Sequence, residues 1–162
     1  MYYRFGKVFH FISILLFVFV FLYTYSALPD LVGFEQSESG EFTKSGSKST
    51  FFYIGIIAFG VLNLILALPA KMIEKQSTPN LKRLFPKGDS ITDYMVTWMY
   101  SFMGVINVSL SIMSLFVHAI NNQNEIGTGS FAFFFYLVPV LFVVWIIGLF
   151  WILLQKFKSI QQ

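Results

Sequence analysis

The sequence predicts an all-α membrane protein with four transmembrane helices, and three observations support this fold class. Hydrophobic residues make up 56% of the chain and aromatic residues 20%, whereas only 12% are charged, about half the share in a typical soluble protein. The charged residues leave four stretches without any Lys, Arg, Asp or Glu: 8–29, 49–70, 94–124 and 126–155. The basic residues also gather on alternate sides of these stretches. We therefore expect residues 1–162 to form a single integral membrane domain.

Each charge-free stretch is long enough to cross a bilayer, because about 20 apolar residues span a hydrocarbon core of ~30 Å. We place the helices at about 8–28, 51–70, 94–119 and 130–155, joined by an outer loop at 29–50 and an inner loop at 71–93. The chain has no cysteine, and its short loops leave no room for a folded soluble domain.

The first helix has some features of a secretory signal. Arg4 and Lys7 precede an apolar run, and the small residues Thr24, Ser26 and Ala27 follow it. The run from Val8 to Leu22 is long for the apolar core of a signal, which typically has about 7–15 residues. We therefore expect an uncleaved transmembrane helix.

The basic residues predict the orientation, because Lys and Arg that flank membrane helices are retained in the cytoplasm. Nine of them precede the first helix, lie in the inner loop or follow the fourth helix, and only Lys44 and Lys48 lie in the outer loop. Both termini are therefore expected in the cytoplasm. The excess of basic residues fits attraction to anionic lipid headgroups and calls for no nucleic acid partner.

The inner loop contains the signature of a short interfacial helix. Thr78 followed by Pro79 is typical of an N-cap with proline at the first helical position. Pro86 and Gly88 should end this helix. Residues 90–93 resemble a capping start for the third transmembrane helix, with the acidic Asp93 placed near its positive end.

Two further segments allow alternatives. The outer loop is rich in Ser and Gly, so it is either a flexible connector or an ordered element. In the fourth helix, Pro139 predicts a bend. Trp145 should lie about 9 Å deeper than Trp151, so its indole N–H either pairs with a neighbouring helix or faces lipid unpaired.

The charge-free stretches offer little for catalysis. Ionisable side chains at depth mark proton relays and ion sites in membrane proteins, but here the only such candidates are His10, near the inner end of the first helix, and His118, near the outer end of the third. A metal or haem shared by the two is disfavoured by this separation. We interpret His10 as an interfacial residue and His118 as a hydrogen-bonding cap, and we expect no enzymatic activity, cofactor or metal.

The third helix carries a stripe of small and polar residues within one arc of its surface. Such a stripe allows close approach of helices and interhelical hydrogen bonds, and the second helix offers a matching face. We expect Asn63 to contact Ser101 and Gly104. The alternatives are a polar path or ligand groove and a docking face for another subunit. The candidate residues are Gly60, Asn63, Ser101, Gly104, Asn107, Ser111 and His118.

A motif opens the outer loop and ends at the next helix. Its residues are Leu28, Pro29, Asp30, Val32, Gly40, Ser47 and Lys48. In these positions the chain resembles the N-terminal unit of a small bacterial membrane family of mostly unknown function, which includes the SdpI-type immunity proteins against a secreted toxin. The chain departs from that pattern at Gly33, Glu35, Gln36 and Thr43, where the family has proline, histidine, phenylalanine and aspartate. A role of the family's histidine would be absent here.

The resemblance implies a bacterial cytoplasmic (inner) membrane protein with a structured outer loop. Together with the residue pattern, it leads us to expect a non-enzymatic accessory subunit that binds another membrane protein or a second copy of itself, or an immunity-like protein that acts at the outer face. The alternative is a small transporter or channel component that uses the polar stripe of the third helix.

Overall fold

The computed structural model describes residues 3–37, 41–122 and 132–161 and is mostly helical. Four helices are long and apolar enough to cross a membrane, which confirms this part of the prediction and makes the chain a multi-pass membrane protein. They are α1 (Tyr3–Ala27), α2 (Lys48–Lys75), α4 (Ser90–Asn121) and α5 (Ala132–Gln161). A short helix, α3 (Pro79–Leu84), and two strands, β1 (Leu31–Gln36) and β2 (Phe42–Ser47), complete the described elements.

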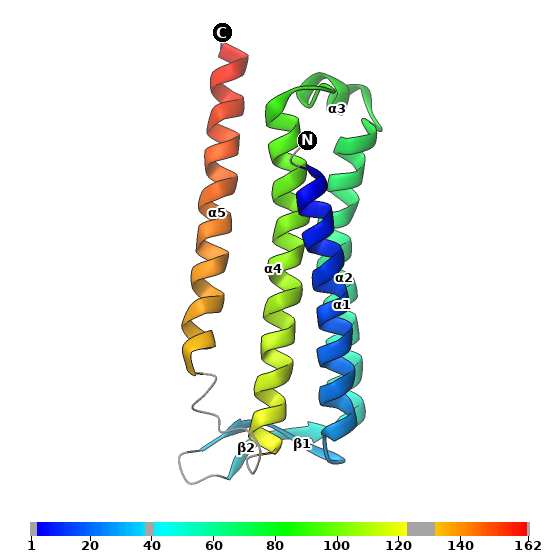
Figure 1. The fold of residues 1–162 in the computed structure, drawn as a ribbon, viewed down its shortest axis with the longest axis vertical. Coiled ribbons are helices and arrows are strands. Elements are labelled where there is room, and N and C mark those ends of the chain that lie inside the picture. The colour runs from blue at the N-terminus through cyan, green and yellow to red at the C-terminus, as the bar shows by residue number, and fades with distance from the viewer. Residues whose placement is uncertain (1–2, 38–40, 123–131, 162) are drawn as a thin grey trace.

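The long helices lie side by side, and the smaller elements close the two ends of the bundle (Figure 1). The strands lie at one end, which we call the hairpin end. The helix α3 lies at the other, which we call the α3 end, and the described chain begins and ends there (Figure 1).

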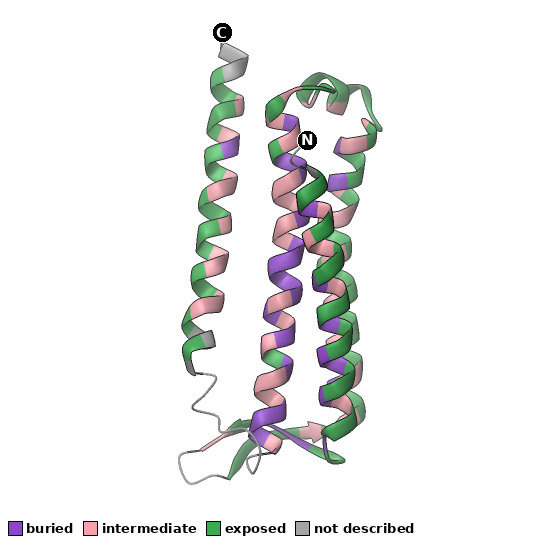
Figure 2. Ribbon diagram, viewed as in Figure 1, coloured by how far each residue is buried: buried purple, intermediate pink, exposed green. Residues whose placement is uncertain are grey.

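Helix α4 is the centre of the bundle, because it contacts α1, α2, α5 and β1. Buried residues make up 61% of its most apolar stretch, against 28% for α1 and 6% each for α2 and α5, and Figure 2 shows this contrast along the helices. Among the described elements, α5 contacts α4 alone. The outward faces of α2 and α5 are apolar and exposed, as expected for surfaces in lipid.

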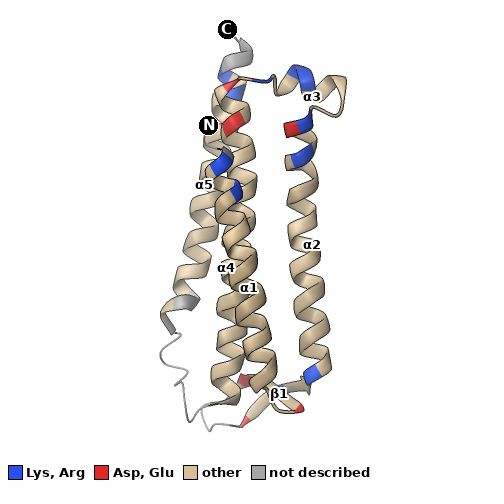
Figure 3. Ribbon diagram, turned by 45° about the vertical axis from the view of Figure 1, so that its right-hand side comes forward, with Lys and Arg blue, Asp and Glu red and all other residues tan. Residues whose placement is uncertain are grey.

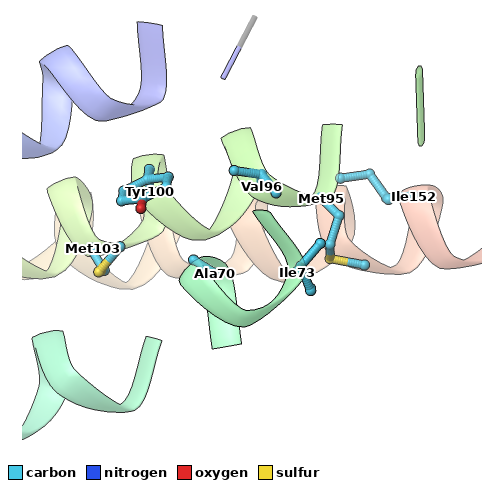
Figure 4. Close-up of a cluster of buried hydrophobic side chains, with 7 residues drawn as sticks. All are labelled: Ala70, Ile73, Met95, Val96, Tyr100, Met103 and Ile152. Carbon is cyan, nitrogen blue, oxygen red and sulfur yellow. The ribbon is translucent and has the colours of Figure 1, made fainter. Parts of the chain in front are cut away.

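Two apolar clusters lie at different levels of the bundle. The cluster near the α3 end joins α2, α4 and α5 and consists of Ala70, Ile73, Met95, Val96, Tyr100, Met103 and Ile152 (Figure 4). The cluster near the hairpin end joins α1, α2 and the hairpin and consists of Phe17, Phe21, Leu28, Val32 and Phe51. In it the rings of Phe17 and Phe21 are stacked with centroids 5.2 Å apart.

The helix ends follow local capping residues, so the helices extend beyond the charge-free stretches. The Thr78 side chain accepts a hydrogen bond from the Leu81 amide at the start of α3, which confirms the predicted cap. Helix α2 starts at Lys48 because the Ser47 hydroxyl caps it. Helix α4 starts at Ser90 and not at 94, because Asp89 accepts from the Ile91 amide. Asp93 lies in the first turn of α4, as predicted.

Of the two alternatives for the outer loop, the ordered element is the one observed, because β1 and β2 form an antiparallel hairpin. The loop is polar and carries few β-branched residues, so it has little intrinsic tendency to form strands. Docking explains the outcome. Val32 is fully buried in the cluster at the hairpin end, and the backbone of Gly33 is held by α4.

The charged residues lie at the two ends of the bundle and the middle is free of them (Figure 3). Nine Lys and Arg residues lie toward the α3 end, in the first turns of α1, the last turns of α2, in α3, between α3 and α4, or in the last turns of α5. The other two, Lys44 and Lys48, lie at the hairpin end.

Candidate functional site

Four polar side chains meet in the middle of the bundle and join α1, α2 and α4. They are His10 and Ser13 of α1, Asn63 of α2 and Asn107 of α4, and we call them the polar ring. His10 Nε2 lies 2.9 Å from Asn63 Oδ1, and Asn63 Nδ2 lies 2.7 Å from Asn107 Oδ1. Asn107 Nδ2 then donates to Ser13 Oγ at 3.0 Å, and Ser13 Oγ donates to the His10 carbonyl at 2.7 Å. The bonds thus form a closed cycle.

The direction of each bond in the polar ring is fixed by chemistry. An amide oxygen can only accept, so His10 Nε2 carries the proton that it shares with Asn63. The Asn63 amide nitrogen donates to Asn107 and also to the Phe59 carbonyl one turn back, at 2.8 Å. All four amide atoms of the two asparagines therefore have partners inside the bundle, as expected where water is scarce.

The polar ring lies deep in the protein, since Ser13 is 1% exposed and Asn107 is 0% exposed. The sequence predicts Asn63 as an interhelical packing residue, but it assigns the wrong partners. Asn63 contacts His10 and Asn107, because Asn107 of α4 bonds to Asn63 of α2 and to Ser13 of α1 at the same level of the bundle. His10, which the sequence places near the interface, also bonds through its ring to Asn63 of α2.

A charged group adjoins the polar ring toward the α3 end. Lys7 of α1 and Glu74 of α2 form an ion pair. The hydroxyl of Tyr100 donates a long hydrogen bond, 3.5 Å, to the same carboxylate. The Tyr100 ring also lies 5.8 Å from the His10 ring. The sequence missed this group, because each of its charged residues lies just outside a charge-free stretch and only the packing of three helices brings them together.

Glycines on two helices allow α1 to approach α4 closely. A Cβ atom on Gly6 would lie 2.9 Å from the Thr97 carbonyl oxygen, and one on Gly104 would lie 2.4 Å from the Phe9 ring. Gly104 therefore packs against α1 and not against Asn63. The predicted packing role of Gly60 is wrong, because Gly60 is exposed and a Cβ there would meet no atom within 4 Å.

Ser101 belongs to the contact between α4 and α5. Its hydroxyl accepts a hydrogen bond from Trp145 Nε1 at 2.9 Å and donates to the Trp98 carbonyl at 3.0 Å. In turn, Trp98 Nε1 donates to the Trp145 carbonyl at 2.7 Å. The two indoles thus clamp α5 to α4. Of the two alternatives for Trp145, the partner on a neighbouring helix is confirmed.

The remaining hydroxyl groups of the stripe bond to their own helix. Ser111 donates to the Asn107 carbonyl at 2.8 Å, and Ser114 donates to the Leu110 carbonyl at 2.9 Å. A hydroxyl that is bonded in this way has no proton left for a ligand. Residues of the stripe therefore contact three different helices, α1, α2 and α5. The hydroxyl protons of Ser111 and Ser114 are used in bonds within α4.

His118 differs from the rest of the stripe. It is 1% exposed, and its ring lies 5.3 Å from the Tyr23 ring of α1. Neither ring nitrogen has a hydrogen-bond partner among the described residues. The prediction that its side chain caps the helix is wrong, because the bond at this position comes from the Asn122 amide to the His118 carbonyl. Thr24 of α1 is also fully buried, and its hydroxyl has no partner in the same ranges.

The motif of the outer loop fastens the hairpin to the helices. The Lys48 ammonium donates to the Leu28 carbonyl at 2.7 Å and lies 4.9 Å from the centre of the Tyr25 ring. The Lys48 amide donates to the Asp30 carbonyl at 3.0 Å. Leu28 is buried and Pro29 is exposed, whereas Gly40 lies outside the described residues.

A second fastening was not predicted from the sequence. Asn121, in the last turn of α4, receives the Gly33 amide proton at Oδ1 and donates to the Gly33 carbonyl through Nδ2, both at 2.8 Å. Proline, which the resembling family has at position 33, could not donate that amide proton. The only sequence signal is an asparagine at a helix end, and this is common for other reasons.

The exposed face of the hairpin carries an ion pair. Lys44 Nζ lies 2.7 Å from Glu35 Oε2. The hydrogen bond from Lys44, followed by its charge, holds the pKa of Glu35 below its ordinary value of 4.5. The same bond and charge raise the pKa of Lys44 above 10.5. Both side chains are mostly exposed, so the pair adds little to stability.

No protein-family model, no curated protein and no solved structure matches this chain.

Proposed function

We propose that this chain is a non-enzymatic membrane protein of the bacterial cytoplasmic membrane that binds a protein partner through its hairpin end. The observation that carries the proposal is the fastened hairpin. Its backbone is tied to α4 through Asn121 and to α2 through Lys48. A loop that only connected two helices would have no need of these bonds.

The exposed strand of the hairpin is suited to a partner. All residues of β2 except Gly46 are exposed, and β1 is the strand that contacts α4. Among the described residues β2 pairs with β1 alone, and the second edge of such a strand can accept a further strand from another protein. Lys44 and Thr43 add polar side chains to the same surface.

The orientation in this proposal rests on the basic residues. The nine at the α3 end would face the cytoplasm under the rule that basic flanks stay inside. The termini would then be cytoplasmic, α3 would lie on the cytoplasmic surface and the hairpin would lie outside. An outer hairpin agrees with an accessory subunit or an immunity-like protein, as the resemblance of the motif suggests.

The orientation is tested by single cysteines in a chain that has none of its own. Thr43→Cys in β2 and Ser77→Cys before α3 are both exposed. A membrane-impermeant thiol reagent added to intact cells should modify Thr43→Cys and spare Ser77→Cys. The opposite pattern would reverse the orientation.

The partner is tested by site-specific photo-crosslinking in cells. A photoreactive amino acid at Thr43 should give a discrete adduct with one protein, identified by mass spectrometry, whereas the same group at the exposed Asn80 of α3 should not. Asn121→Ala, which releases Gly33, should weaken the adduct. Adducts of equal yield from both positions, or none from Thr43, would refute the proposal.

A transporter or channel component remains the second candidate, because buried polar groups follow the contact of α1 with α4 from the polar ring to Thr24 and His118. The closed cycle of the polar ring argues against an open path at that level. Asn107→Cys separates the two functions. A conduit predicts that a small water-soluble thiol reagent reaches it from both sides of the membrane, whereas a closed bundle predicts no labelling.

A further inference from the structure

The outward face of the hairpin, the face turned away from the helices, carries a small apolar patch. Leu31 of β1 is 61% exposed and Phe42 of β2 is 44% exposed. A Cβ atom on Gly33 would lie 2.3 Å from the Phe42 ring, so this ring occupies the space that a side chain of Gly33 would fill. Side chains two residues apart on a strand point to the same face. Leu31 therefore lies beside the Phe42 ring, and we call the two the hairpin patch.

The opposite face of the hairpin is the one that packs on the helices. Val32 is fully buried there in the cluster near the hairpin end, and the Phe34 ring of the same strand is stacked on Phe51 of α2. The hairpin patch has no part in this packing. An exposed aromatic and aliphatic pair with polar residues around it is typical of a surface that binds protein.

The charges around the hairpin patch are mainly negative. The loop between α1 and α2 contains four acidic residues and two lysines. Lys44 is paired with Glu35, and Lys48 donates to a backbone carbonyl of the loop. Asp30 and Glu41 take part in none of the ion pairs among the described residues, and both are exposed. Acidic residues of the hairpin end are visible in Figure 3.

The two acidic residues without an ion pair adjoin the hairpin patch in the sequence. Asp30 directly precedes Leu31, and Glu41 directly precedes Phe42. Carboxylates at the rim of an apolar surface attract a basic partner and repel an acidic one. They also repel the phosphate groups of anionic lipids, so a membrane surface is a poorer occupant of this face than a basic protein segment.

We propose that the hairpin end binds a basic segment of its partner, which places an apolar side chain on the hairpin patch and Lys or Arg beside Asp30 and Glu41. This inference rests on the proposed function and names the chemistry of the partner. A segment that pairs with the edge of β2 directs every second side chain to the outward face. The backbone of the hairpin then provides the pairing, and the patch with its carboxylates provides the choice of partner.

The test is photo-crosslinking in cells with a photoreactive amino acid at Ser45. Ser45 is exposed and lies opposite Gly33 in the hairpin, so its side chain projects from the outward face. The crosslinked segment of the partner, mapped by mass spectrometry, should carry a net positive charge. Neutralising one carboxylate, as in Glu41→Gln, should lower the adduct yield about threefold, and Asp30→Lys with Glu41→Lys should lower it about tenfold or more.

Two further variants separate the apolar contact from a general effect on the protein. Phe42→Ser should lower the adduct yield about tenfold, whereas Phe42→Leu, which keeps an apolar side chain, should retain most of it. The matched charge control is Lys82→Glu on the exposed surface of α3, which should leave the adduct unchanged because it lies at the other end of the bundle.

The hairpin without these replacements gives a second readout, because salt screens the attraction between exposed charges. Raising the NaCl around the cells from about 20 mM to about 500 mM should lower the adduct yield severalfold. A yield that responds neither to salt nor to the lysine replacements, or a crosslinked segment that is neutral or acidic, would overturn this inference and leave the proposed function standing. No protein adduct from either Thr43 or Ser45 would refute both.

Discussion

Replacing the two asparagines of the polar ring tests whether the ring joins the helices. Asn63→Leu removes two interhelical hydrogen bonds, to His10 and to Asn107. Asn107→Leu also removes two, to Asn63 and to Ser13. Interhelical hydrogen bonds contribute about 0.6 kcal/mol each on average in membrane proteins. Each replacement should therefore lower the free energy of unfolding by about 1.2 kcal/mol.

The double replacement of Asn63 and Asn107 measures the coupling between the two residues. It removes three distinct bonds, because the bond between Asn63 and Asn107 is shared. The expected loss is about 1.8 kcal/mol, against about 2.4 kcal/mol for the sum of the single replacements. The difference of about 0.6 kcal/mol is a lower bound, because each single replacement also leaves an amide of the other asparagine without its partner.

The measurement is unfolding of the purified protein in mixed micelles by increasing sodium dodecyl sulfate, followed by tryptophan fluorescence. Ser114→Ala is the matched control, because within the described residues the Ser114 hydroxyl bonds to the Leu110 carbonyl of its own helix, and its loss should change stability little. Losses that add without coupling would refute the closed cycle. A loss in Ser114→Ala equal to that in Asn63→Leu would refute the assignment of the effect to interhelical bonds.

Three other predictions concern single positions. His118→Leu should raise the free energy of unfolding by about 1 kcal/mol, since it removes two buried nitrogens that have no partner in the described ranges. Gly6→Ala should destabilise by about 1–3 kcal/mol, because its Cβ would meet the backbone of α4, whereas Gly60→Ala should be neutral or stabilising by up to about 1 kcal/mol. Lys44→Met should raise the pKa of Glu35 toward 4.5, measured by NMR titration of its side chain.

Each of these has a contrary outcome. A destabilised His118→Leu would indicate a bound water or ion at the His118 imidazole. Equal losses of stability in Gly6→Ala and Gly60→Ala would refute the close contact of α1 with α4.

In the ion pair of Glu35 with Lys44, the pH dependence of stability has opposite signs for the two partners. The lowered pKa of Glu35 makes its contribution present above 4.5 and lost as the pH falls through the lowered value. The raised pKa of Lys44 makes its contribution present below 10.5 and lost at higher pH. An unchanged Glu35 titration in Lys44→Met would show that the pair does not form.

The helices and their approximate limits could be predicted from the sequence, because each depends on local properties. A run without charges must be long enough to cross hydrocarbon, and a helix end depends on a few capping residues. Thr78 and Pro79 therefore located α3 correctly. The start of α4 was misplaced only because Asp89, a better cap than any residue at 90–93, lies one position upstream.

The partners of the polar residues could not be predicted in the same way. The periodicity of one helix shows which residues share a face, but not which neighbour covers that face. The sequence identified Asn63, Asn107, Ser101 and His118 as the residues to examine. It assigned Ser101 to α2, although Ser101 bonds to Trp145 of α5.

The membrane location, the four spans and the uneven distribution of basic residues thus follow from the sequence alone, because hydrophobicity, length and charge act on each segment separately. Tertiary structure decided the rest. It placed α4 at the centre, brought Lys7 to Glu74 and closed the polar ring across three helices. It also ordered the polar loop into a hairpin, since strands with little propensity of their own form when Val32 can be buried and Asn121 can bind the backbone of Gly33.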